Sequence, residues 1–137
     1  MKQDLDTILA AKAIDALLVT GPGQHNPAMF YFTGGGHLTS ADVIKKQGQP
    51  PVLFHAPMER DEAAKTGLVT YSYSRYPLRN LLQAAGGDLI RALALRYTKM
   101  FAEIGLDAGR VALYGLTDLS VAFPIFSELQ RLMPAIE

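Results

Sequence analysis

Residues 26–37 read Asn-Pro-Ala-Met-Phe-Tyr-Phe-Thr-Gly-Gly-Gly-His, an aromatic run that ends in three consecutive glycines. The short apolar segment of residues 16–20, Ala-Leu-Leu-Val-Thr, precedes this run and predicts a buried strand. Binding residues often lie on loops that a rigid scaffold positions. We therefore expect the stretch from residue 26 to residue 37 to help shape a functional site.

The composition indicates one globular domain spanning residues 1–137, with 49% hydrophobic and 19% charged residues. The chain has 13 basic and 13 acidic residues, and this balance argues against binding to nucleic acid or to an anionic membrane. It has no cysteine, which excludes disulfides and zinc–thiolate sites. No signal-peptide core precedes the first helical pattern, and no apolar run reaches the roughly 20 residues that span a bilayer. We expect a cytoplasmic protein.

Strand and helix patterns alternate along the chain, which is typical of the α/β class. Strands are expected at residues 16–20, 29–32, 41–46, 51–55, 68–73 and 110–114, with the start of another at 135–137. Helices are expected at residues 5–13, 58–66, 78–85, 88–104 and 124–132. The strands at 41–46 and 51–55 flank a turn that contains glycine and form an antiparallel hairpin. The prediction is a three-layer α/β/α domain on a mixed sheet.

The residues that could carry chemistry do not form a catalytic set. His25, His37 and His55 lack the spacing of four residues that places two metal ligands on one helical face. The glycine clusters match neither a phosphate loop nor a dinucleotide fingerprint, and no serine has the context of an activated nucleophile. Glu59 and Glu62 are explained by the preference for acids in the first turn of a helix. We expect no catalytic residue and no metal ligand in this chain.

Two features keep both a functional and a structural interpretation. His37 follows three glycines in a loop that could approach a ligand, and it could equally be an ordinary loop residue. Tyr71, Tyr73, Arg75 and Tyr76 form an aromatic and basic group that is typical of partner contacts. A half-buried strand that leads into a loop would explain this second group equally well.

The order of the motifs resembles the N-terminal domain of the creatinase/prolidase/Xaa-Pro aminopeptidase family over nearly the whole chain. The motifs are Asn26, Tyr-Phe-Thr-Gly at residues 31–34, the hairpin, Glu-Arg-Asp-Glu-Ala-Ala at 59–64, the long helix with Gly-Leu at 105–106, and Gly-Arg-Val-Ala-Leu-Tyr at 109–114. The resemblance implies a mixed-sheet α/β/α fold with ribonuclease H-like topology.

The resemblance also implies the function. In this family a pita-bread catalytic domain follows the N-terminal domain and binds two divalent metal ions, commonly manganese, cobalt or zinc, that activate a water to cleave the bond before proline. The chain would then be a non-catalytic fragment of a longer hydrolase, and it would hold no cofactor itself. Its partners would be its own catalytic domain, a second subunit in a homodimer and the parent's peptide substrate.

By position, the resemblance implies substrate-proximal roles for Tyr31, Thr33, Gly34 and His37. The chain departs from the family pattern at two places. Phe30 stands where relatives usually have a basic residue, and glycines stand where they usually have an apolar residue after Gly34. Two alternatives remain: a protein-binding module from a relative that has lost catalysis, and a standalone small-molecule-binding α/β domain.

Overall fold

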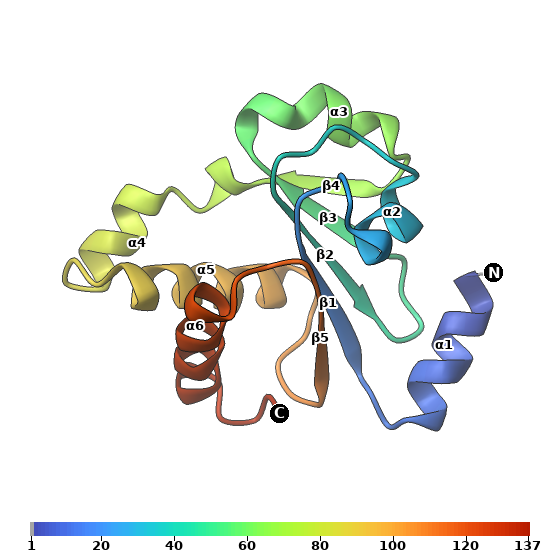
Figure 1. Ribbon diagram of the computed structural model, residues 1–137. Helices are drawn as coiled ribbons and strands as arrows, with labels where there is room; N and C mark the ends of the chain where they lie inside the picture. Colours follow the sequence, from blue (N-terminus) through green and yellow to red (C-terminus); the bar gives the residue numbers. More distant parts are fainter. Residues whose placement is uncertain (1) are drawn as a thin grey trace. The chain divides into compact units, whose positions relative to one another are not determined.

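The computed structural model describes residues 2–137, and in this range five strands alternate with six α-helices (Figure 1). The strands are β1 (Ala16–Gly21), β2 (Ala41–Lys46), β3 (Val52–His55), β4 (Val69–Ser72) and β5 (Val111–Gly115). The helices are α1 (Lys2–Ala11), α2 (Pro27–Thr33), α3 (Arg60–Lys65), α4 (Leu78–Ala84), α5 (Leu89–Glu103) and α6 (Leu119–Leu132). Two short 3-10 helices, η1 (Pro57–Glu59) and η2 (Tyr73–Arg75), precede α3 and α4.

The five strands form one mixed sheet in the order β4-β3-β2-β1-β5. Strand β2 runs antiparallel to both of its neighbours, β1 and β3, whereas β5 pairs with β1 and β4 pairs with β3 in parallel. The parallel pairs require crossover connections, and helices provide them. The predicted α/β class, mixed sheet and β2–β3 hairpin are therefore confirmed.

The chain divides into two compact units. The first contains the sheet and consists of the residues up to 73 together with residues 110–116. The second is helical and consists of residues 74–109 and 117–137. Within the helical unit α5 packs against α6, where the rings of Tyr97 and Phe126 lie 5.2 Å apart, and Arg91 and Glu128 form an ion pair of 3.6 Å.

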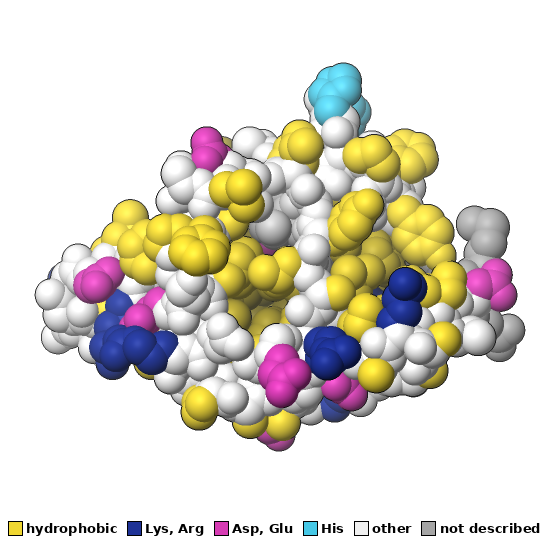
Figure 2. All heavy atoms as spheres, turned by 60° about the horizontal axis from the view of Figure 1, so that its bottom comes forward, with side chains coloured by type: hydrophobic (Ala, Val, Ile, Leu, Met, Phe, Trp, Pro, Cys, Tyr) yellow, Lys and Arg dark blue, Asp and Glu magenta, His cyan; other side chains and the backbone are white. Residues whose placement is uncertain are grey.

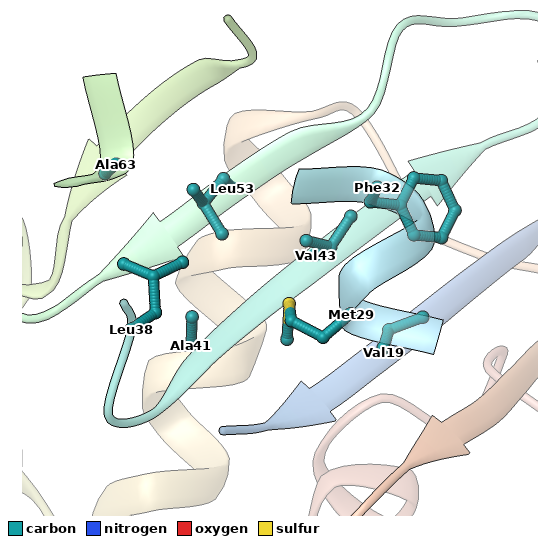
Figure 3. Packing of buried hydrophobic residues seen from close by; sticks show 8 residues of the cluster. All are labelled: Val19, Met29, Phe32, Leu38, Ala41, Val43, Leu53 and Ala63. Carbon is teal, nitrogen blue, oxygen red and sulfur yellow. The ribbon is translucent and has the colours of Figure 1, made fainter. Parts of the chain in front are cut away.

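One core of the sheet unit lies between the sheet and helices α2 and α3 (Figure 3). It contains eight buried side chains from the strands, the two helices and the loop before β2: Val19, Met29, Phe32, Leu38, Ala41, Val43, Leu53 and Ala63. Residues two apart in a strand share a face, so Ala41 and Val43 both face this core. Met29 and Phe32, three residues apart on α2, do so because this spacing places them on one side of a helix.

The expected strand at residues 29–32 is wrong, because these residues belong to helix α2. A four-residue apolar run cannot separate a buried strand from a buried helix, and the flanking residues decide the matter here. The Asn26 side chain accepts a hydrogen bond from the Met29 backbone N–H, Pro27 occupies the first turn, and Gly34 ends the helix with φ of 72°.

The other expected helices are confirmed apart from their ends, and so are the strands expected at residues 16–20, 41–46, 51–55, 68–73 and 110–114. Helix α6 begins at Leu119, five residues before the expected start at Pro124, because Asp118 caps it by accepting from the Ser120 N–H. Pro124 therefore lies inside the helix. Asp88 caps α5 by accepting from the Arg91 N–H, and the Leu106 N–H donates to the Phe101 carbonyl at 2.9 Å. At residues 135–137, where the start of a strand was expected, the structure has only an isolated parallel bridge between Ile136 and Gly109.

Among the residues that the structure describes, no helix is long and apolar enough to cross a membrane.

Candidate functional site: two joined loops at one end of the sheet

The candidate site lies where β1 ends, β2 begins and β3 ends. The register pairs Gly21 of β1 with Ala41 of β2, and Ala41 with His55 of β3, so these three strand ends meet at one end of the sheet. The loop after β1 (residues 22–26), the loop before β2 (residues 34–40) and the start of η1 therefore gather there. This arrangement follows from the antiparallel pairing, which brings successive turns to alternate ends of a sheet.

Helix α2 connects the two loops, and its caps fix both ends. Asn26 is buried, accepts from the Met29 N–H and donates from Nδ2 to the Thr20 carbonyl at 3.2 Å. This second bond ties the helix start to the end of β1. At the other end, the Gly34 N–H donates to the Phe30 carbonyl at 2.8 Å in a left-handed conformation that glycine adopts without strain.

The backbones of the two loops touch. The Gly23 N–H donates to the Leu38 carbonyl at 2.8 Å. A Cβ atom at position 23 would lie 2.6 Å from the Gly36 carbonyl oxygen, so only glycine permits this approach. The glycine at position 23 therefore serves backbone packing between the loops.

Two carboxylates hold the loop of residues 34–40 from the side of α3. The Thr39 N–H donates to Oε1 of Glu59 at 2.5 Å, and the His37 N–H donates to Oε2 of Glu62 at 3.3 Å. Glu59 precedes α3, and Glu62 lies in its first turn. From the sequence, both acids were explained by the helix dipole alone. Hydrogen bonds to a charged acceptor are stronger than neutral ones, so these contacts define the loop conformation.

The environment of Glu62 favours its charged form. The Lys65 ammonium, which donates to Glu62 Oε1, and then the His37 N–H hold the pKa of the Glu62 carboxyl below its ordinary value. Partial burial opposes this shift, and the two hydrogen bonds outweigh it. Glu62 therefore binds the loop as a carboxylate at neutral pH.

The imidazole of His37 is oriented by Gln24, whose Nε2 lies 2.7 Å from Nδ1 of the histidine. The amide nitrogen of glutamine is a donor only, so Nδ1 accepts and the imidazole proton lies on Nε2. Because His37 is exposed, this N–H can donate to a ligand carbonyl or carboxylate. Histidine side chains stand out from the surface in Figure 2.

Three of the four expected site residues are exposed in the structure, and the fourth is buried. Tyr31 is 44% exposed on α2, and Gly34 and His37 are exposed in the loop that follows. Thr33 is buried, and its hydroxyl donates to the Met29 carbonyl at 2.9 Å inside the helix. Thr33 can therefore influence a ligand only by holding the end of α2 in place.

The exposed groups of this arrangement can contact a ligand. Among residues 2–137, no group of three or more histidine, aspartate or glutamate side chains could hold a metal ion. His55 is buried, with Nδ1 at 2.7 Å from the Ala56 carbonyl, so it supports the end of β3. The exposed groups are an aromatic ring at Tyr31, an imidazole N–H at His37 and loop backbone.

Sequence reasoning missed the three residues that anchor the loop, Gln24, Glu59 and Glu62. Their partners lie 13 to 25 positions away along the chain, so no local spacing could have revealed these contacts. The aromatic and basic group at residues 71–76 also has a structural explanation. The Tyr73 hydroxyl donates to the buried Asp42 carboxylate at 2.5 Å, and the Tyr71 ring packs on Phe54.

No protein-family model and no curated protein matches this sequence. Solved structures with a similar fold do match. The N-terminal domain of a Xaa-Pro dipeptidase from Lactobacillus brevis aligns with a TM-score of 0.61 at 13% identity, over 98% of this chain and 89% of that one. The creatinase/prolidase N-terminal domain of an X-Pro dipeptidase from Streptococcus pyogenes gives 0.57 at 16% identity, over 100% of this chain and 93% of that one.

The chain has the creatinase/prolidase N-terminal domain fold. The expected resemblance is thereby confirmed at the level of fold. A dipeptidase from Pyrococcus horikoshii also aligns, with a TM-score of 0.55 at 12% identity over 92% of this chain, and this chain covers 31% of that protein. In that longer dipeptidase the shared fold is therefore one part of a larger chain.

Proposed function

We propose that this chain is the non-catalytic N-terminal domain of a metal-dependent Xaa-Pro peptidase, an aminopeptidase or dipeptidase, in which it shapes the substrate pocket and supports dimerisation. The observation that carries this proposal is the match of nearly the whole chain to N-terminal domains of proteins described as Xaa-Pro dipeptidases. In this proposal the parent is a cytoplasmic hydrolase, and residues 1–137 are one domain of it.

The exposed apolar surface of the sheet unit supports a role beside another protein surface. Strand β5 lies at one edge of the sheet, and its Leu113 and Tyr114 are 50% and 66% exposed. Successive strand residues point to opposite faces, so both faces of β5 present apolar side chains. Leu116, just after the strand, is also exposed. Exposed apolar surface of this kind marks protein contacts.

The helical unit shows the same property at the start of α6. Leu119, Val121 and Phe123 are all at least half exposed in the first turns of that helix. A helix of a monomer normally turns such residues toward its own core. We propose that these surfaces contact the catalytic domain of the parent or its second subunit, the partners that the family resemblance implies.

The loop of residues 34–40 is our proposed substrate-proximal element. Tyr31 and His37 would contact peptide substrate, and Gly34 would permit the loop conformation, with Thr33 fixing the end of α2. The parent's catalytic domain would hold two divalent metal ions, manganese, cobalt or zinc, and those ions would activate the attacking water. This chain would contribute contacts to the substrate and no chemistry.

The first test is the intact mass of the native protein isolated from its source. A mass more than twice 14.9 kDa, together with hydrolysis of Xaa-Pro peptides that chelator abolishes and manganese restores, is the expected result. A native mass near 14.9 kDa would refute the proposal. A longer protein with no metal-dependent hydrolysis would instead favour the alternative of a protein-binding module.

The second test concerns the loop. In the active parent, His37→Ala should raise KM for Xaa-Pro peptides several-fold with a smaller change in kcat, because a binding contact is lost while the metal site is intact. Gln47→Ala, in the exposed turn between β2 and β3, is the matched control and should change neither constant. Equal KM values for the His37 variant and wild type would remove His37 from the proposed site.

A further inference from the structure

The helical unit contains a cleft of about 670 Å³ that the two joined loops do not form. Its walls come from residues 75–77, from α4 and from the last two turns of α5. The side chains used below are Arg75, Tyr76, Asn80, Leu81, Lys99 and Glu103. This volume falls within the range of small-molecule sites, which are mostly apolar with a few placed polar groups.

The cleft carries an excess of positive charge. Nη2 of Arg75 donates to Oε1 of Glu103 at 2.9 Å, so the only acid among the lining residues is already paired with an arginine. Lys99 precedes Glu103 by four residues on α5, and a lysine placed N-terminal to a glutamate at this spacing is in the weaker orientation. Within residues 2–137 Lys99 forms no ion pair. The cleft thus has two cations and one anion.

The remaining walls of the cleft are apolar or neutral. Tyr76 and Leu81 are buried, so each exposes only a small part of its side chain to the cleft, and Pro77 and Ala102 add exposed apolar surface. The exposed Asn80 amide adds a neutral donor. One surplus positive charge beside apolar surface matches a monoanion on a hydrocarbon body better than a compact dianion. The Glu103 carboxylate would also repel a dianion more strongly.

We propose that this cleft binds a small carboxylate with an apolar body. The carboxylate pairs with the Lys99 ammonium and accepts from the Asn80 amide, while the body lies against Tyr76 and Leu81. Lys99 is exposed and hydrated, so the affinity is modest. The proposal does not depend on the peptidase assignment, because it uses only residues of the helical unit.

The test is a titration of the ¹⁵N-labelled 137-residue chain with benzoate, followed by NMR. Benzoate should shift the backbone amide signals of Asn80, Lys99 and Ala102 with saturation, whereas benzamide, its neutral counterpart, should shift them little. Inorganic phosphate is the third probe. Equal shifts with benzamide would overturn the carboxylate contact, and equal or larger shifts with phosphate would overturn the monoanion class.

Two variants locate the carboxylate. Lys99→Ala should weaken benzoate binding three- to tenfold, and Glu103→Gln should strengthen it because the repelling charge is removed. Lys12→Ala removes an exposed lysine that does not line the cleft and should leave the affinity unchanged. Unchanged affinity in Lys99→Ala, with a spectrum that shows the intact fold, would overturn the proposal.

Discussion

The loop of residues 34–40 and strand β5 are both exposed, but they are stabilised in opposite ways. The loop is anchored by polar contacts with side chains of its own unit, through Gln24, Glu59 and Glu62. Strand β5 pairs with β1 along one side and exposes the apolar side chains of Leu113 and Tyr114. A surface fixed by its own hydrogen bonds is preorganised for a ligand, whereas an apolar surface gains stability when a second surface covers it.

The two regions meet at the carbonyl oxygen of Thr20. This oxygen accepts from Nδ2 of Asn26, which caps the helix before the loop, and from the N–H of Leu116, just after β5. Gly115 lies directly beside it, with φ of 126°, and a Cβ atom there would stand 2.1 Å from the same oxygen. One backbone position therefore supports both regions.

The largest effect is expected for Gly115→Ala, which should break this shared support. A strained backbone of this kind costs about 1–3 kcal/mol, and the contact with the Thr20 oxygen adds to that cost. The free energy of unfolding from urea titration would measure the loss. Gly48→Ala is the control, because Gly48 also has positive φ but has open space around it. A smaller loss for Gly115→Ala than for Gly48→Ala would contradict the close approach of β1 and β5.

The next prediction is a substitution that should loosen the loop and leave β5 unchanged. Asn26→Ala removes the cap of α2 and leaves the buried Met29 N–H without its acceptor, and we expect a loss of about 0.5–2 kcal/mol. Asp118→Ala removes the exposed cap of α6 and should cost less. Hydrogen exchange would show where the structure loosens: faster exchange is expected in residues 27–40 and not in β5. Faster exchange in β5 alone would show that Asn26 supports β5 and not the loop.

A third effect is the pH dependence of the loop anchor. Because the folded pKa of Glu62 is lowered, its contribution to stability is fully present above the ordinary pKa of about 4.5 and is lost as the pH falls through the folded pKa. Glu62→Gln removes this contribution, so it should lower the stability at pH 7 and flatten its decline on the acid side, and the variant and wild type should converge as the pH approaches 3. Melting temperatures from pH 7 down to pH 3 would measure this. Identical acid profiles for the variant and wild type would contradict the anchoring role.

The smallest effect on folding is expected for Tyr114→Lys on β5. Its side chain is largely exposed, so the free energy of unfolding of the chain should change by no more than about 0.5 kcal/mol. In the parent protein proposed above, the same change should weaken contact with the neighbouring domain or subunit, which sedimentation of the parent and limited proteolysis would detect. A large loss of stability in the isolated chain would show that Tyr114 serves this unit's own core.

Much of the fold followed from local signals. The apolar alternation and turn residues predicted the β2–β3 hairpin, and Asp88 and Gly105 predicted both ends of α5. The error at residues 29–32 arose because the apolar run was weighed above Asn26 and Pro27, although those two residues start a helix. The early start of α6 was missed for a similar reason, since Pro124 received more weight than the Asp118 cap.

The candidate site, like the fold, could be predicted from the sequence only in part. The sequence alone determined which elements form, because caps, glycines and hydrophobic periodicity act within a few residues of the chain. It also directed attention to Tyr31 and His37. Only the tertiary structure decided that Thr33 is buried, and that Glu59, Glu62 and Gln24 hold the loop across 13 to 25 positions. The β1–β2 and β2–β3 pairings bring those residues together, and such long-range contacts leave no spacing that a sequence can show.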